Sequence, residues 1–164
     1  MAKPARAAAR RSAEKRLCEN RRARHDYEIL ETFTAGLVLL GWEVKSVRGG
    51  RAQISESYVV PARGEFFLLN SHFSPLISAS THVEADPSRS RKLLLTAREI
   101  RRLLGRVREA GLTLVPLNMH LSRGKIKLHI GLARGKKRHD KRHAKQKRDW
   151  NRQQQRILKG GRKD

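Results

Sequence analysis

Apolar and charged side chains are distributed so unevenly along this chain that only its middle part can build a core. Residues 1–24 carry nine basic and two acidic side chains, and residues 134–164 carry fourteen and three. Residues 25–133 hold fifteen basic and ten acidic side chains, a balance typical of a soluble domain. The large apolar side chains of the last segment are only Trp150, Ile157 and Leu158, with Ala144 besides. Ordering a residue costs about 1–2 kcal/mol, which so few apolar groups cannot offset.

The chain therefore divides into one folded domain and two basic arms. We expect a flexible arm over residues 1–19, a domain over residues 20–133, and a tail over residues 134–164 that is unfolded when free. Asp140–Leu158 contains no Gly or Pro and is rich in helix formers. Bound to a polyanion that neutralises its charge, this segment could form a helix about 28 Å long.

The net charge of +23 and the pI of about 11.5 favour a polyanionic partner. No uncharged apolar run exceeds four residues, so we expect no membrane partner. The single cysteine, Cys18, can form neither an internal disulfide nor a cysteine-rich zinc site. Phosphate-binding glycine motifs are absent from the sequence, and we expect no cofactor, no metal and no small-molecule substrate. These features suit a cytoplasmic protein.

Alternating apolar residues predict short antiparallel strands. Four clean alternations run from Ile126 to Leu132, and a preceding strand changes phase at Val115-Pro116, where we expect a bulge or an edge position. Other segments predicted to be extended are His25–Phe33, Leu37–Leu40 after a turn at Ala35-Gly36, and a hairpin of Ser57–Pro61 with Glu65–Asn70. We expect Leu37–Leu40 to be largely buried, and residues 74–92 to form a long loop.

The clearest helix begins after Thr96, where Glu99 completes a capping box. Its apolar stripe is Ile100, Leu103, Leu104 and Val107. Gly41–Arg48 fits one or two further helical turns before Gly49-Gly50. The fold class that follows is mainly β with flanking helices, a small antiparallel barrel followed by a disordered basic tail.

Nucleic-acid binding is the strongest functional signal. Guanidinium groups bind phosphate bidentately, and Asn or His can hydrogen-bond a sugar or an unstacked base. Such side chains meet where the first arm joins the domain, at Asn20, Arg21, Arg22, Arg24 and His25. Lys45 and Arg48 are further candidates, beside a Trp42 that we expect to be buried. Tyr58, Phe66, Phe67 and Phe73 are interpreted as core rather than as base-stacking residues. The arginine-rich outer face of the helix after Thr96 fits an RNA-facing surface and a solvated surface equally well.

Catalysis has weak support. His25-Asp26 with Glu28 or Glu31 could be drawn as an acid–base pair, but charges on the solvent face of a strand explain them about equally well. His139 and His143 lie four residues apart within a strongly basic run that would repel a metal cation. We therefore predict no catalytic residue and no metal site.

Several motifs, taken in order, resemble one family, small protein B, the SsrA-binding proteins that escort transfer-messenger RNA. The motifs are NRRARHDY (20–27), AGLVLLGWEVKSVRGG (35–50), SESYV (55–59), DPSRSRKLLL (86–95), GLTLVPL (111–117), KIKLHIGLARGKK (125–137) and HDKR (139–142). Each motif alone is weak, but their joint occurrence at family spacing is specific. The resemblance implies a barrel of the oligonucleotide-binding type.

The resemblance also implies partners and site residues. Such proteins bind the tRNA-like domain of transfer-messenger RNA and enter the vacant ribosomal A site, with elongation factor Tu acting indirectly through the aminoacylated RNA. The residues that match the RNA-facing surface of the family are Asn20, Arg21, Arg22, Arg24, His25, Lys45, Arg48, Leu94 and Lys127. Those that match the tail, which becomes helical in the decoding centre and message channel against small-subunit rRNA, are Lys136, Lys137, His139, Asp140, Lys141, Arg142, Trp150, Ile157 and Leu158.

The sequence also departs from the family. Thr34 stands where many relatives carry glutamate, and Gln53 and Glu56 replace the commoner asparagine and aspartate. Two other functions remain open on the sequence: a small basic ribosomal or ribosome-assembly protein, and an RNA-modifying or RNA-cleaving enzyme using His25.

Overall fold

The computed structural model describes residues 15–77, 84–109, 111–137, 149 and 151–152. This part of the chain forms nine strands and the three helices α2, α3 and α4. In order they are β1 (Lys15–Glu19), α2 (Ala23–Asp26), β2 (Tyr27–Leu37), α3 (Gly41–Arg48), β3 (Ala52–Gln53), β4 (Tyr58–Ala62), β5 (Glu65–Leu69), β6 (His72–Phe73), β7 (Arg91–Leu94), α4 (Ala97–Val107), β8 (Leu112–Ser122) and β9 (Lys125–Gly135).

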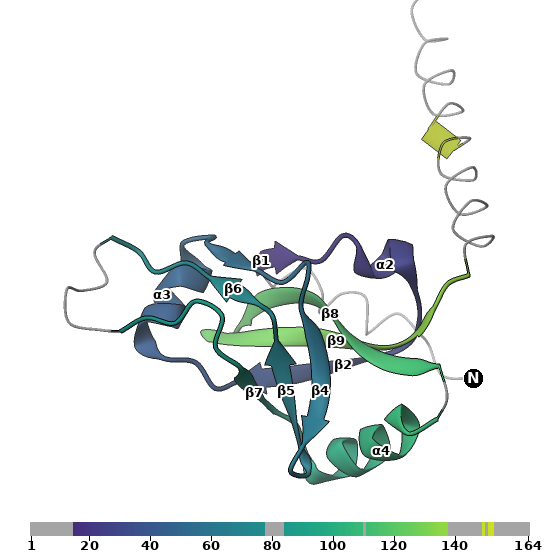
Figure 1. Ribbon diagram of the computed structural model, residues 1–164. Helices are drawn as coiled ribbons and strands as arrows, with labels where there is room; N and C mark the ends of the chain where they lie inside the picture. The colour runs from purple at the N-terminus through teal and green to yellow at the C-terminus, as the bar shows by residue number, and fades with distance from the viewer. Residues whose placement is uncertain (1–14, 78–83, 110, 138–148, 150, 153–164) are drawn as a thin grey trace, which may run out of the picture.

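The main sheet closes on itself, which confirms the predicted small antiparallel barrel. Its strand order is β1-β8-β4-β5-β7-β2-β9, and a further β8–β9 ladder joins the two sides (Figure 1). Every pairing is antiparallel, and β3 with β6 forms a separate two-stranded sheet. The predicted bulge in β8 is also present, as a register shift between Pro116 and Asn118.

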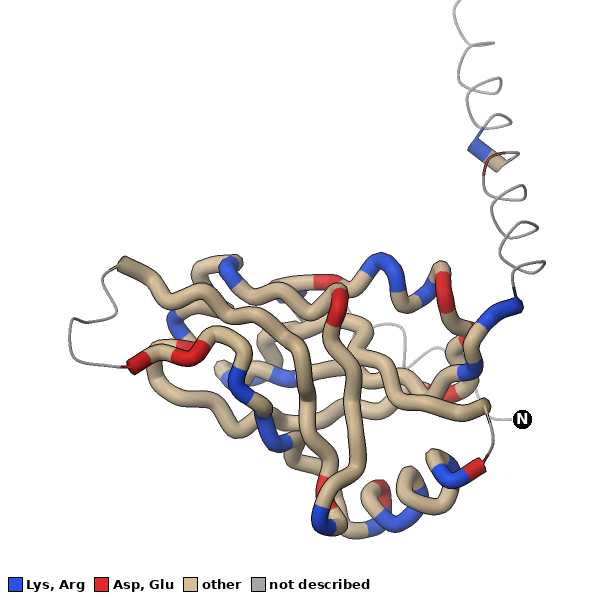
Figure 2. The backbone as a smooth tube through the Cα atoms, viewed as in Figure 1, with Lys and Arg blue, Asp and Glu red and all other residues tan. Residues whose placement is uncertain are grey.

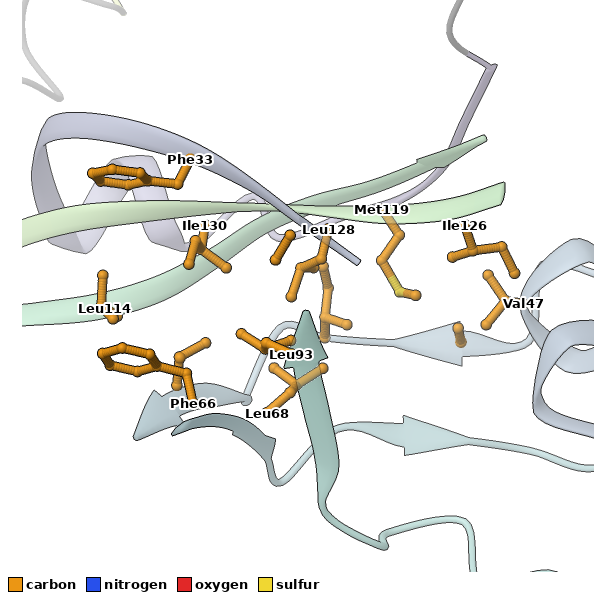
Figure 3. Packing of buried hydrophobic residues seen from close by; sticks show 14 of the residues in the cluster. Phe33, Val47, Phe66, Leu68, Leu93, Leu114, Met119, Ile126, Leu128 and Ile130 are labelled. Atoms are coloured by element: carbon orange, nitrogen blue, oxygen red, sulfur yellow. The ribbon is translucent and has the colours of Figure 1, made fainter. Parts of the chain in front are cut away.

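The barrel interior is filled by the inward halves of the alternating strands (Figure 3). Leu128, Ile130 and Leu132 of β9 are completely buried and meet Phe66 and Leu68 of β5 in one cluster. Trp42 is buried as expected, as are Phe66 and Phe73, whereas Tyr58 is 47% exposed and is not a core residue. Burial of apolar area contributes about 25 cal/mol per Å² to stability, so this single cluster is the main source of it.

Local signals placed several elements correctly. Glu99 Oε2 accepts hydrogen bonds from the Thr96 amide and hydroxyl at 2.9 and 2.7 Å, and Leu103 of the α4 stripe is fully buried. β4 and β5 meet through Arg63-Gly64, whose φ angles of 51° and 74° are those of a tight hairpin turn. Arg123-Gly124 repeats this geometry between β8 and β9.

The expectation that order begins near Asn20 is wrong. β1 starts at Lys15 and pairs with β8, so the last five residues of the predicted flexible arm form a strand. The helix α2, which precedes β2, was also not expected. Lys15–Glu19 shows little apolar alternation, so its sequence does not predict a strand. Its backbone pairs with β8, and only Leu17 and Cys18 pack against the core.

The predicted turn at Ala35-Gly36 is also wrong, since β2 runs without a break from Tyr27 to Leu37. Leu94 packs closely over Gly36: a Cβ on Gly36 would lie 3.1 Å from the Leu94 Cβ, so a larger residue there would have to displace Leu94 by a few tenths of an ångström. The next residues are not the buried segment that was expected. Val38 and Leu40 are 44% and 47% exposed.

Two other expectations meet the structure only in part. The segment 74–92 contains no regular structure from Ser74 to Ile77, but its last residues belong to β7. Most of the tail, 138–148 and 153–164, lies outside the described residues, while Asp149, Asn151 and Arg152 have helical backbone. No helix among the described residues is long and apolar enough to cross a membrane.

Candidate nucleic-acid interface

A shallow groove collects three of the sequence-predicted residues from three different elements. Arg48 ends α3, Leu94 ends β7, and Lys127 lies in β9, and all three line a depression of about 260 Å³. Arg48 Nη2 donates a hydrogen bond at 3.2 Å to the carbonyl of Gly124, which holds the α3 end against the β8–β9 turn. Lys45 is exposed on α3 but does not line the groove.

Strand register explains why these side chains meet. Gly36 of β2 pairs with Leu94 on one side and with Lys127 on the other. Because Gly36 has no side chain, Leu94 can pack directly over the β2 backbone while remaining 51% exposed. The groove thus combines an apolar floor with cationic edges, which suits a nucleotide whose base contacts the floor and whose phosphate contacts the edges.

Several residues of this groove were missed by sequence reasoning. Its cationic edge includes Lys125, and its apolar lining includes Leu37, Leu39 and Val44. The available signal was the unbroken apolar run 37–40, which was interpreted as core. The exposure of this run depends on how α3, β2 and β7 pack together, which the run itself does not indicate.

A buried ionic network holds the elements around the groove in place. Glu43 of α3 is fully buried and accepts hydrogen bonds from Arg89 (2.6 and 2.9 Å) and Arg91 (2.9 Å). Arg91, also fully buried, further donates to Ser71 Oγ and to the carbonyl of Pro87, and its guanidinium lies 3.8 Å from the centre of the Phe73 ring. The network therefore joins α3 to the segment that leads into β7.

Charge within the network is balanced by these contacts. Burial alone would raise the pKa of Glu43. Hydrogen bonds from Arg89 and from the Leu40 amide, with the charges of Arg91 and Arg89, outweigh burial and hold the pKa of Glu43 below its usual value. Glu43 is therefore ionised at neutral pH and fixes the first turn of α3, where its Oε2 accepts the Leu40 N–H at 2.7 Å.

The other sequence-predicted residues lie around α2. Asn20 is 5% exposed, and its side chain is fully engaged: Nδ2 donates to the Pro116 carbonyl at 3.0 Å, and Oδ1 accepts the Ala23 N–H at 3.2 Å. Asn20 thus connects the first residue of α2 to β8, which is the geometry of a positioning residue.

Arg21, Arg22 and Arg24 are exposed, and Arg22 forms an ion pair with Glu56. His25 is half-buried, with its Nδ1 3.0 Å from Asp26 Oδ1. The start of the tail lies against the same helix. Lys136 donates from its amide to the Asp26 carbonyl and from Nζ to the Arg24 carbonyl, both at 3.0 Å. Residues more than 110 positions apart thereby form one cationic surface, which we call the α2 surface: Arg21, Arg22, Arg24, His25, Lys136 and Lys137.

The groove and the α2 surface lie at opposite ends of one ladder. Tyr27, directly after α2, pairs with Gly135, whereas Gly36 at the groove pairs with Lys127. Nine residues of strand at ~3.3 Å each separate these pairs by about 30 Å. Figure 1 shows α2 and α3 correspondingly at opposite ends of the barrel. The sequence-predicted RNA-facing residues therefore form two surfaces rather than one.

The remaining predicted residues lie outside the described part of the chain, which ends its continuous run at Lys137. These are His139, Asp140, Lys141, Arg142, Trp150, Ile157 and Leu158. Among the described residues, no group of three or more His, Cys, Asp or Glu side chains is placed to hold a metal ion.

Comparison with known proteins gives a consistent result. A family model described as SmpB protein matches residues 17–160. The SsrA-binding protein of Thiobacillus denitrificans is 57% identical over 143 residues, covering 87% of this chain and 96% of the relative. That of Cupriavidus necator is 55% identical over 148 residues, covering 90% and 99%. A solved structure described as "tmRNA-SmpB: a journey to the center of the bacterial ribosome" is 49% identical, with a TM-score of 0.61, covering 77% of this chain and 92% of that one.

Proposed function

The chain belongs to the SmpB family of SsrA-binding proteins, and from that premise we propose that it binds the tRNA-like domain of transfer-messenger RNA and delivers this RNA to stalled ribosomes. The function is trans-translation, in which a stalled ribosome is rescued and its incomplete nascent chain is tagged. The observation that carries the assignment of a site is the groove, where Arg48, Leu94 and Lys127 converge from three elements.

We propose that the groove binds the tRNA-like domain. Structured RNA presents unstacked bases mainly in its loops, where a base can contact apolar side chains while its phosphates meet cations. Leu94 and Val44 supply the apolar contact, and Arg48, Lys125 and Lys127 supply the charge. The network of Glu43, Arg89 and Arg91 fixes α3 against the start of β7, so Val44 and Arg48 of α3 are held near Leu94 before RNA arrives, which lowers the entropy cost of binding.

The α2 surface, at the other end of the barrel, is assigned to the ribosome. The tail leaves the barrel there, because Lys136 is fixed against α2. The tail residues Lys136, Lys137, His139, Asp140, Lys141 and Arg142 would meet small-subunit rRNA in the decoding centre, with Trp150, Ile157 and Leu158 farther along the message channel. A channel that still held message would exclude the tail sterically, so the tail detects a missing message without pairing with any base.

This mechanism needs binding and delivery alone. Elongation factor Tu participates through the aminoacylated RNA, and the protein itself acts without turnover as an RNA-binding protein of the cytoplasm. His25, drawn above as a possible base, lies next to Asp26 on the α2 surface and about 30 Å from the groove.

Deletion of residues 138–164 tests the division of labour. Binding of the purified truncated protein to the tRNA-like domain should stay within about threefold of the full chain, because the groove is intact. Tagging of nascent chains on a truncated message, in a reconstituted translation system, should be lost. The control is tagging with the full chain under the same conditions.

Two results would contradict the proposal. Equal loss of RNA binding and of tagging would mean that the tail and the barrel share one RNA site. Full tagging without the tail would mean that the tail does not detect the empty channel.

A further inference from the structure

The outer face of α4 carries a charge pattern that neither proposed surface uses. All five arginines on it are exposed: Arg98, Arg101, Arg102, Arg106 and Arg108. At 3.6 residues per turn they fall within an arc of about 160°, opposite the buried stripe around Leu103. Figure 2 shows Lys and Arg positions from the first turn of α4 to its end.

Neighbouring carboxylates neutralise only part of this face. Arg102 pairs with Glu31 at 2.9 Å, and Arg106 pairs with Glu109 at 3.2 Å. Within the described part of the chain, Arg98, Arg101 and Arg108 have no carboxylate within 4 Å. The one carboxylate near the start of the helix, Glu99, is held by the backbone and hydroxyl of Thr96.

The centre of the arginine face is bare. Gly105 lies near the middle of the arc, and a Cβ placed there would meet nothing within 4 Å. Packing therefore does not require a glycine at this position, and glycine is a poor helix former. The absence of a side chain at Gly105 leaves open space between the arginines.

The start of α4 lies close to the groove along the chain. Thr96, the N-cap of α4, follows Leu94 by two residues, so Arg98 lies at most about 14 Å along the chain from a groove residue. Arg98 and Arg101, which have no carboxylate partner, thus lie at the end of α4 that is nearest the groove. An RNA strand that leaves the groove toward β7 meets them first.

We propose that the arginine face of α4, above all Arg98 and Arg101, binds the sugar–phosphate backbone of the same tRNA-like RNA that occupies the groove. Guanidinium forks bind phosphate bidentately, and such contacts position an RNA without reading its sequence. The face extends the footprint along the side of the barrel. This inference rests on the proposed function, which supplies the RNA.

The test compares two double variants of the same helix with the same change in charge. R98A/R101A removes the arginines that lack carboxylate partners, and R102A/R106A removes the paired ones. Affinity for the isolated tRNA-like domain is measured by fluorescence anisotropy over a series of salt concentrations. Each phosphate contact contributes about 0.7–0.9 to the slope of log K against log salt, so R98A/R101A should lower that slope by about 1.5 and weaken binding roughly tenfold or more near 0.1 M salt. R102A/R106A should weaken it by less than about threefold.

A second experiment distinguishes binding to the tRNA-like domain from binding to ribosomal RNA. The same variants are measured on vacant ribosomes without transfer-messenger RNA, where R98A/R101A should lose less affinity than on the isolated domain. A loss on ribosomes as large as that on the isolated RNA, or equal effects of the two double variants, overturns the inference. Failure of the unmodified protein to prefer the tRNA-like domain over an unrelated hairpin would instead refute the proposed function.

Discussion

At the scale of single residues, the groove depends on a carboxylate that never touches it. Glu43 of α3 is buried against the guanidinium groups of Arg89 and Arg91, which lie just before β7 and at its first residue. Removing one member of a buried ion pair leaves an uncompensated charge, which is costly because the low-dielectric interior cannot solvate it. Glu43 is therefore expected to determine both stability and its pH dependence.

We predict that Glu43→Gln lowers the free energy of unfolding by about 3–5 kcal/mol at pH 7, measured by urea denaturation. The matched control is Glu65→Gln, which breaks the half-exposed pair with Lys92 and should cost only about 0–1 kcal/mol. Equal losses in the two variants would show that the buried network has no special weight.

Glu43 should also make the stability of the protein depend on pH. Because the pKa of Glu43 is lowered in the folded state, its contribution to stability is fully present above its ordinary value of 4.5. It is lost as the pH falls through the lower folded-state pKa. Unfolding of the unmodified protein and of Glu43→Gln should therefore converge on acidification, and a gap that stays constant down to pH 3 would contradict this assignment.

At the scale of elements, β1 changes the boundary of the domain. Its residues pair with β8 from Lys15↔Leu121 to Glu19↔Asn118, with a register shift between Arg16 and Cys18. The backbone of this edge strand supplies the ladder hydrogen bonds, while its side chains lie exposed or half-buried. Burial raises the pKa of the Cys18 thiol to about 11, which marks the part of β1 that faces the barrel.

Two truncations test whether β1 belongs to the folded unit. Removing residues 1–14 should leave the melting temperature within about 2 °C of the full chain, since no described element begins before Lys15. Removing residues 1–19 should lower the melting temperature by about 4 °C or more, because β8 then exposes an unpaired edge. Identical melting curves for the two truncations would show that the folded domain begins at Asn20 and that β1 does not stabilise it.

At the scale of the whole molecule, the proposed function uses the two ends of the barrel. The groove and the α2 surface are separated by about 30 Å of the β2–β9 ladder, so one partner can be held at each end. Mutations more than about 10 Å apart without shared contacts usually act independently. The two surfaces should therefore be separable by mutation.

We predict that Arg48→Ala/Lys127→Ala weakens binding to the tRNA-like domain about tenfold or more, because it removes two cations from the groove. Arg21→Ala/Arg24→Ala makes the same change in charge on the α2 surface and should change that affinity by less than about threefold, while lowering ribosome binding. Filter binding to each partner provides the measurement. Indistinguishable effects of the two pairs on RNA binding would show that net charge, rather than position, determines affinity.

What could be predicted from sequence was whatever depends on neighbours along the chain. The Thr96–Glu99 capping box, the alternation from Ile126 to Leu132 and the Arg63-Gly64 turn are local patterns, and each element was found where its pattern lies. The basic motif at Asn20–His25 and the family motifs likewise need no tertiary information.

Only the tertiary structure decided which distant segments pack against one another. Gly36 is a strand residue rather than a turn because it pairs with Leu94 of β7 on one side and with Lys127 of β9 on the other, and Asn20 is buried because β8 offers the Pro116 carbonyl. The sequence determined that this protein has a barrel, basic arms and RNA as a partner, since composition and local pattern are properties of the chain itself. Barrel closure determined that the cations form two surfaces about 30 Å apart, because strand register, which no local pattern encodes, sets which residues become neighbours.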